Sequence, residues 1–223
     1  MLELAGTIGV LGGTFDPVHR AHLHLARAAR SQLGLARVLW IPAGNPPHRH
    51  PPEATSAHRL AMVRLAVADE AGFEVDDAEV LANSPSYTVP TLERLRRNMD
   101  AEQPLVLLLG ADAFLGLPAW HRWQELFSLA HLAVAARPGA ALDANHMNPA
   151  LADIYRQRRQ DSPAALAQKS AGAIVGFTIE PVEPPDLSAT AIRQGLHDGK
   201  ADAVAAMLPP GVLDYIQTHS LYH

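Results

Sequence analysis

Residues 7–22 of the chain are TIGVLGGTFDPVHRAH. A short apolar run at 7–11 ends at Gly12 and Gly13, and a segment with helical spacing follows at 18–33. Glycine lets the backbone turn sharply and lets a ligand approach it closely. This order predicts a β-strand, a glycine turn and a helix, which together form the first unit of an α/β fold.

The same alternation continues along the chain. Short apolar runs bounded by turn residues predict strands at 7–11, 37–41, 105–109, 131–136 and 173–179. Helical spacing predicts helices at 18–33, 56–71, 89–99 and 150–159, and a last helix after Pro209 and Pro210 that buries Val212, Leu213 and Ile216. We therefore expect a Rossmann-like, doubly wound parallel sheet with helices on both faces, which binds its ligands at the carboxyl ends of the strands.

Length and composition limit the function. The 223 residues predict a single domain over 1–223, whose C-terminal part, about 187–223, is helical. The net charge of -5 argues against nucleic-acid binding, and the absence of cysteine excludes disulfides, zinc–thiolate sites and thiol nucleophiles. No apolar run approaches the roughly 20 residues of a membrane helix, and the N-terminus lacks a signal-peptide pattern. We expect a cytoplasmic protein without membrane or nucleic-acid partners.

Two histidines three residues apart follow the glycine turn. Asp16 and Pro17 predict a helix start, with Asp16 as the side-chain cap, and His19 and His22 then share one face of the first turns. Free backbone N–H groups and the helix dipole favour an anion there, and the imidazoles can donate hydrogen bonds to phosphate. A zinc ion shared by the histidines is the alternative, although no nearby Glu or Cys completes a ligand set, and we predict no protein-bound metal. Two surface histidines without a ligand are the remaining alternative.

A second candidate anion site lies at 187–193, LSATAIR. Ser188 can cap a helix, and Thr190 and Arg193 then lie near the same helix N-terminus. Hydroxyls and a guanidinium in this arrangement suit phosphate, although such a cap is often purely structural.

Both segments carry a family resemblance. Residues 12–22, which we name the first phosphate motif, resemble the GG(T/S)FDP-x-H-x-G-H signature of the nucleotidyltransferase α/β superfamily (HxGH type). Residues 188–193, the second phosphate motif, resemble its C-terminal (I/L)S(S/A)T-x-(I/L)R signature. Ala21 departs from the pattern because the superfamily has glycine there, and the added methyl group predicts a slightly tighter fit.

The middle of the chain resembles one branch of that superfamily, the bacterial nicotinate mononucleotide adenylyltransferases. The matching stretches are IPAGNPPHR (41–49), SPSYT-x-x-TL (84–92), LLGADAFLGLPAWHRWQEL (108–126) and HLAVAARPG (131–139). The resemblance implies transfer of the adenylyl group of ATP to nicotinate mononucleotide, which gives nicotinate adenine dinucleotide and pyrophosphate in NAD biosynthesis, with Mg²⁺ as the cofactor. Alternatives are another acceptor (phosphopantetheine, FMN or nicotinamide mononucleotide) and a non-catalytic nucleotide-binding protein on the same fold.

The matching stretches also suggest where the acceptor binds. His48 and Arg49, on a proline-stiffened loop, suit a phosphate, although a solvated loop or adventitious metal binding by His48 and His50 would explain them too. Thr88 and Val89 begin a helix whose free N–H groups could receive a carboxylate. Trp120 and Trp123 are three residues apart, so we expect one of them in the core.

The resemblance assigns roles to particular residues. Trp120 would stack on the nicotinate ring, while backbone N–H groups near His121 and Val89 hold its carboxylate. Gly110 allows close approach of the nucleotide and Asp112 accepts from ribose hydroxyls, or else caps a helix. The remaining assignments are His19, His22 and Arg193 as catalytic residues, and Gly12, Gly13, Thr14, Phe15, Ser188 and Thr190 as ATP or phosphate ligands.

Overall fold

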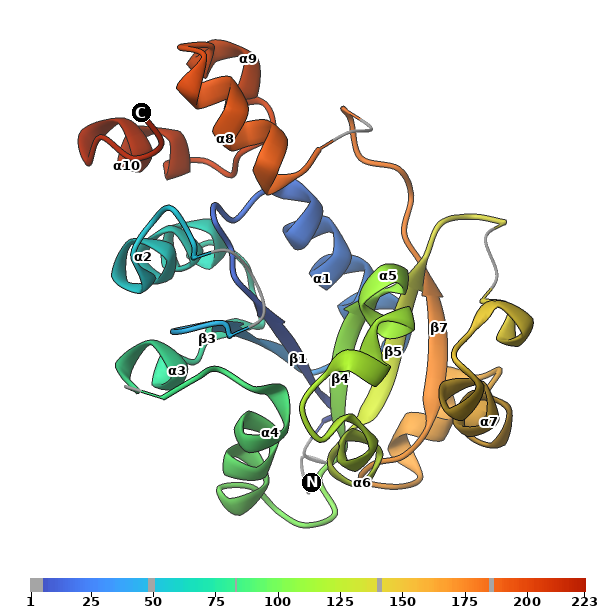
Figure 1. The fold of residues 1–223 in the computed structure, drawn as a ribbon. Coiled ribbons are helices and arrows are strands. Elements are labelled where there is room, and N and C mark those ends of the chain that lie inside the picture. Colours follow the sequence, from blue (N-terminus) through green and yellow to red (C-terminus); the bar gives the residue numbers. More distant parts are fainter. Residues whose placement is uncertain (1–5, 48–50, 83, 140–141, 185–186) are drawn as a thin grey trace. The chain divides into compact units, whose positions relative to one another are not determined.

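The computed structural model describes residues 6–47, 51–82, 84–139, 142–184 and 187–223. The strands of its sheet (Figure 1) are β1 (Ile8–Gly13), β2 (Arg37–Pro42), β3 (Phe73–Val75), β4 (Leu105–Gly110), β5 (His131–Ala136), β6 (Arg159–Gln160) and β7 (Ile174–Thr178). The α-helices are α1 (Arg20–Leu33), α2 (Ser56–Val67), α3 (Ala78–Leu81), α4 (Thr88–Arg97), α5 (Ala111–Leu115), α6 (Leu126–Leu129), α7 (Pro149–Arg158), α8 (Ala189–His197), α9 (Ala201–Ala205) and α10 (Val212–Thr218).

The sheet is parallel, as predicted. Its strand order is β3-β2-β1-β4-β5-β7-β6, and the pairs β1–β4, β4–β5, β5–β7 and β6–β7 all run parallel. The first five residues of β4 and of β5 are all buried. Because successive side chains of a strand point to opposite faces, this pattern requires cover on both faces, which is the doubly wound arrangement.

The predicted elements are present, with shifted ends. The five predicted strands are found, with ends displaced by at most two residues. Strands β3 and β6 were not predicted, since they span only 3 and 2 residues and carry too little hydrophobic pattern. The expectation that Leu213 is buried is wrong: Val212 and Ile216 are fully buried, but Leu213 is partly exposed because it lies to one side of the stripe that they form on α10.

The structure divides into two compact units. Unit 1 contains residues 1–11, 26–39 and 87–180, and unit 2 contains residues 12–25, 40–86 and 181–223. The single domain over 1–223 stays a prediction. Within the residues that the structure describes, no helix combines the length and the apolar character needed to cross a membrane.

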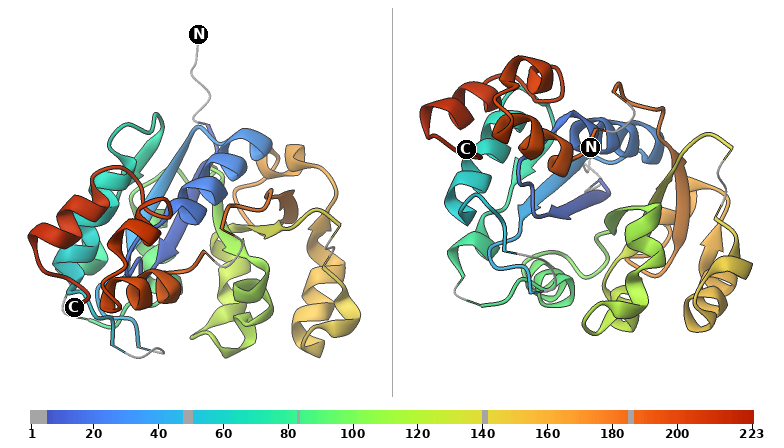
Figure 2. Two further views of the ribbon diagram at one scale, coloured as in Figure 1. Left: turned by 90° about the horizontal axis from the view of Figure 1, so that it is seen from above. Right: turned by 45° about the horizontal axis from the view of Figure 1, so that its top comes forward.

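Unit 2 contains both phosphate motifs. Its last helix, α10, lies beside α2 (Figure 2), where the Tyr215 hydroxyl of α10 lies 3.0 Å from Nδ1 of His58. The start of α1 is tied to the same C-terminal region, because the backbone N–H and Nε of Arg20 donate to the carbonyls of Met207 and Leu208 at 2.9 and 3.1 Å. These contacts join the beginning of the chain to its end around the motifs.

Candidate active site

The first phosphate motif starts at the carboxyl end of β1. Gly12 and Gly13 are the last two residues of that strand, so the expected sharp turn at the glycines is wrong. The turn comes at Phe15, a buried residue whose backbone is left-handed at φ 52°. A Cβ added to Gly13 would lie 3.0 Å from the Phe15 ring. Glycine at position 13 therefore leaves room for the Phe15 ring, which would have to shift by a few tenths of an ångström to admit a side chain.

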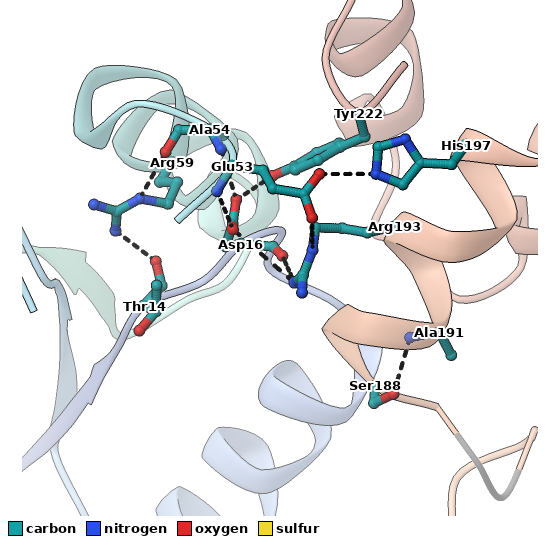
Figure 3. Close-up of polar contacts among 10 residues, drawn as sticks. All are labelled: Thr14, Asp16, Glu53, Ala54, Arg59, Ser188, Ala191, Arg193, His197 and Tyr222. Carbon is teal, nitrogen blue, oxygen red and sulfur yellow. Dashed lines mark hydrogen bonds and ion pairs between the residues drawn. The ribbon is translucent and has the colours of Figure 1, made fainter. Parts of the chain in front are cut away.

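Asp16 does not cap α1, contrary to the sequence expectation. Helix α1 begins at Arg20, and Asp16 is only 6% exposed. Its carboxylate accepts hydrogen bonds from the backbone N–H groups of Glu53 (2.8 Å) and Ala54 (3.1 Å) and from the Tyr222 hydroxyl (2.7 Å), as Figure 3 shows. Asp16 thus connects three distant parts of unit 2.

The two histidines form a stacked pair at the start of α1. The ring centroids of His19 and His22 are 3.8 Å apart, and the edge of Phe15 packs against His22 at 5.0 Å. The His19 backbone N–H donates to Nδ1 of His22 at 3.2 Å. Because Nδ1 of His22 accepts, the proton of the neutral ring lies on Nε2, which makes that atom a hydrogen-bond donor.

Burial keeps both imidazoles neutral. It lowers the pKa of His19 to about 4 and holds the pKa of His22 well below its ordinary value, with the charge of His19 as a second cause. Nδ1 of His19 is buried and has no partner among the described residues. An anion bound beside the pair would favour the protonated forms and raise both pKa values.

Arg59 holds the backbone of the first phosphate motif, a role that reasoning from the sequence missed. It is 1% exposed and lies in α2. Its guanidinium donates to the carbonyls of Thr14 (2.6 Å), Gly44 (3.0 Å) and Ala54 (3.2 Å), so one side chain fixes three loop segments. Burial lowers its pKa, although nearby Asp16 opposes that shift. Nothing in the local pattern of α2 distinguishes such an arginine from a solvated one.

The second phosphate motif is built as predicted at its helix start. The Ser188 hydroxyl accepts from the Ala191 N–H at 3.2 Å and caps α8, whose buried face contains Ile192 and Leu196. Thr190 is exposed in the first turn.

Arg193 joins the two motifs. Its Nη1 donates to the Asp16 carbonyl at 2.7 Å, across 177 residues of sequence (Figure 3). Unit 2 therefore places the guanidinium of the second motif directly against the backbone of the first.

Four of the expected acceptor residues lie in unit 1, where two segments meet: Thr88, Val89, Trp120 and His121. Helix α4 begins at Thr88, with Val89 fully buried behind it, and its first N–H groups have no intrahelical acceptor. The ring of His121 lies 4.5 Å from that of Tyr87, just before the helix. An ion pair of 2.6 Å between Nη2 of Arg122 and Oε1 of Glu93 holds the segment with Trp120 and His121 against α4.

Both Trp120 and Trp123 are partly exposed, so the expectation that one of them lies in the core is wrong. The fully buried tryptophan is Trp40, which packs against Phe15 and Phe73. Trp120 follows a short 3-10 helix (Leu117–Ala119) and is partly exposed.

Gly110 and Asp112 lie at the end of β4. Gly110 is the N-cap residue of α5, and a Cβ added there would meet nothing within 4 Å. Asp112 is therefore not the cap, and its carboxylate is exposed in the first turn. His48, Arg49 and His50 lie outside the described residues. Across the described ranges, no group of three or more His, Cys, Asp or Glu side chains could hold a metal ion.

Comparison with known proteins gives the family of the chain. The family model described as cytidylyltransferase-like matches residues 10–195, so the chain belongs to that class of nucleotidyltransferases. Curated relatives from Dechloromonas aromatica (strain RCB) and Laribacter hongkongensis (strain HLHK9) are 51% and 48% identical and cover 96% of this chain and 97% and 94% of their own. Both are named "Probable nicotinate-nucleotide adenylyltransferase", and at this similarity the chain belongs to the nicotinate-nucleotide adenylyltransferase family.

Solved structures share the fold. Two structures of nicotinic acid mononucleotide adenylyltransferase from Plasmodium falciparum, one complexed with NaAD and one with APC, match with TM-scores of 0.72 and 0.67. Each covers 97% of both chains at 15% identity, so the match concerns the fold alone.

Proposed function

We propose that the protein transfers the adenylyl group of ATP to nicotinate mononucleotide, releasing pyrophosphate and forming nicotinate adenine dinucleotide. The hydrogen bond of 2.7 Å from Arg193 to the Asp16 carbonyl carries the proposal, because it joins the two phosphate motifs in one unit. The names of relatives that are 48–51% identical over 96% of the chain support this acceptor.

The reaction needs no protein nucleophile. The acceptor phosphate attacks the α-phosphorus of ATP, so the enzyme acts by positioning the reactants and stabilising charge. We assign charge stabilisation to His19, His22 and Arg193. The neutral imidazoles of His19 and His22 would gain protons as the nucleotide binds, because the phosphates favour the charged form of the ring. Further backbone or hydroxyl donors, or close backbone approach to ATP, would come from Gly12, Gly13, Thr14, Phe15, Ser188, Thr190 and Gly110. The Asp112 carboxylate would accept from the ribose hydroxyls.

The acceptor assignment rests on the start of α4 and on Trp120. The free N–H groups of Thr88 and Val89, with that of His121, would hold the nicotinate carboxylate, and an indole suits stacking on the planar ring. His48 and Arg49 would bind the acceptor phosphate. Backbone donors reward a negative carboxylate over a neutral amide, so nicotinate mononucleotide should be preferred to nicotinamide mononucleotide.

Magnesium fits the site as a companion of the nucleotide. Since the described residues offer no metal-binding cluster, the triphosphate itself would supply the oxygen ligands that Mg²⁺ prefers. Bound there, the ion would neutralise phosphate charge, while the chain's own residues would bind and orient the nucleotide.

The proposal is tested by measuring pyrophosphate release with ATP and each acceptor in turn. We expect release that depends on nicotinate mononucleotide, with lower kcat/KM for nicotinamide mononucleotide. Equal rates with both would refute the proposed carboxylate contacts. Higher kcat/KM with phosphopantetheine or FMN would identify that compound as the acceptor. Nucleotide binding without pyrophosphate release would indicate a non-catalytic protein.

His22→Ala tests the assignment of the first motif. We expect kcat/KM to fall by about two to four orders of magnitude, the scale of losing a key charge-stabilising donor. His24→Ala, in the same helix, is the matched control and should keep kcat/KM within about threefold of wild type, in the range of changes away from the reacting groups. A near-normal rate in His22→Ala would contradict the assignment.

A further inference from the structure

Both carboxylate oxygens of Glu53 contact side chains of α8, the helix of the second phosphate motif. Oε1 accepts from Nε of Arg193 at 2.7 Å, and Oε2 lies 2.8 Å from Nε2 of His197 (Figure 3). These partners are one turn apart on α8, so a single carboxylate bridges two successive turns of the helix. The backbone N–H of Glu53 donates to Oδ2 of Asp16 at 2.8 Å, which anchors Glu53 itself to the first motif.

These contacts fix the direction of the Arg193 guanidinium. Nε is held by Glu53 and Nη1 by the Asp16 carbonyl, so the side chain is tethered at two of its nitrogens. Nη2 has no hydrogen-bond partner among the described residues, so its N–H groups can donate to an anion. An arginine loses considerable rotamer freedom when it binds, and a side chain that is already tethered pays less of that cost.

We propose that Glu53 is a positioning residue that holds Arg193 in the geometry required for phosphate contact. This inference rests on the proposed function, because it assumes that Arg193 acts on the nucleotide. Glu53 acts through Arg193 and makes no contact with the reacting atoms itself. It also ties the segment that follows residues 48–50 to the second phosphate motif, so the two halves of the phosphate site share one anchor.

The opposite role would have a different signature. If Glu53 competed with phosphate for Arg193, its removal would release the guanidinium and strengthen nucleotide binding. KM for ATP would then fall and kcat would hold or rise. A positioning role predicts that kcat falls while KM for ATP moves little, because the ground state binds the triphosphate through many other donors.

The first test compares Glu53→Ala and Glu53→Gln. We expect Glu53→Ala to lower kcat by about 10- to 100-fold, the scale reported for small misplacements of a catalytic group, with KM for ATP within about threefold. Glu53→Gln keeps an acceptor oxygen for Nε of Arg193 and should recover most of the lost kcat. Asp69→Asn, an exposed carboxylate in the same unit, is the matched control and should behave as wild type.

A double-mutant cycle shows whether Glu53 acts through Arg193. In an Arg193→Ala background, assayed at high enzyme concentration, Glu53→Ala should cause no further loss beyond about twofold, because its target is already absent. Full additivity would overturn the inference, as would wild-type kcat in Glu53→Ala or a lower KM for ATP. If thermal unfolding shows that Glu53→Ala does not fold, Glu53→Leu, which also removes both acceptor oxygens, is taken through the same cycle with the same criteria. Failure of the proposed function is a separate result, in which wild type and Asp69→Asn release no pyrophosphate.

Discussion

At the scale of single residues, the stacked pair of His19 and His22 is the most unusual feature of the phosphate site. Two imidazoles with centroids 3.8 Å apart would repel each other if both were charged, and burial already disfavours the first proton. In the free protein both imidazoles are therefore neutral, and their pKa values rise only when an anion binds beside them. Nucleotide binding should be coupled to proton uptake for this reason.

The low pKa of His19 makes stability depend on pH. Its pKa is about 4 in the folded chain and 6.5 when unfolded, so between these values the unfolded chain binds more protons. This contribution to stability is complete above pH 6.5 and is lost as the pH falls toward 4, by about 3 kcal/mol in total. Urea unfolding of wild type and His19→Gln at pH 7, 5.5 and 4 measures it. Wild type should lose more stability on acidification, and parallel curves would contradict the prediction.

Residue roles were predictable where the partner is local. Ser188 caps α8 through Ala191, three residues away, and the S-x-T pattern contains that information. Asp16 was predicted as a helix cap from the same kind of local pattern. That prediction failed because its partners Glu53 and Tyr222 are 37 and 206 residues away. Its carboxylate is satisfied by tertiary contacts that no short-range pattern records.

At the scale of elements, the long buried strands and the amphipathic helices could be predicted from the sequence. β4 is a continuous apolar run, β5 is apolar after His131, and the ends of both fall within one residue of the predicted ones. The start of α1 was predicted two residues early, because Asp16 and Pro17 resemble a helix start while Asp16 is used elsewhere. Short elements such as β3 and α3 depend on their neighbours for stability and leave little trace in the sequence.

Ala21 lies in α1, at the position where the superfamily signature has glycine. It lies in the first turn with an ordinary helical backbone, so alanine suits the position. Ala21→Gly should lower the free energy of unfolding by about 0.5–1 kcal/mol, the difference in helix propensity, without changing kcat/KM by more than about twofold. Ala28→Gly in the same helix should cost about the same stability. A large gain or loss of activity in Ala21→Gly alone would show that the methyl group affects the nucleotide.

At the scale of the whole molecule, unit 2 is closed by the end of the chain. Tyr222 is 5% exposed, has a left-handed backbone at φ 62°, and reaches Asp16 across 206 residues of sequence. A left-handed backbone costs free energy at a non-glycine residue, so the contacts of the Tyr222 side chain must offset that cost. Burial, followed by the bond to the Asp16 carboxylate, raises the pKa of the Tyr222 hydroxyl, which keeps it a donor at neutral pH.

Removing that hydroxyl tests how much the closure contributes. Tyr222→Phe deletes a hydrogen bond of 2.7 Å to a buried carboxylate, which should lower the free energy of unfolding by about 1.5–3 kcal/mol, because hydrogen bonds to charged groups are among the strongest. Tyr215→Phe is the matched control: it deletes a bond of 3.0 Å to His58 at a partly exposed site and should cost less than about 1 kcal/mol. Chemical denaturation at pH 7 measures both. Equal stabilities would mean that Asp16 is satisfied by its two backbone donors alone, and that the end of the chain does not help to hold the first phosphate motif.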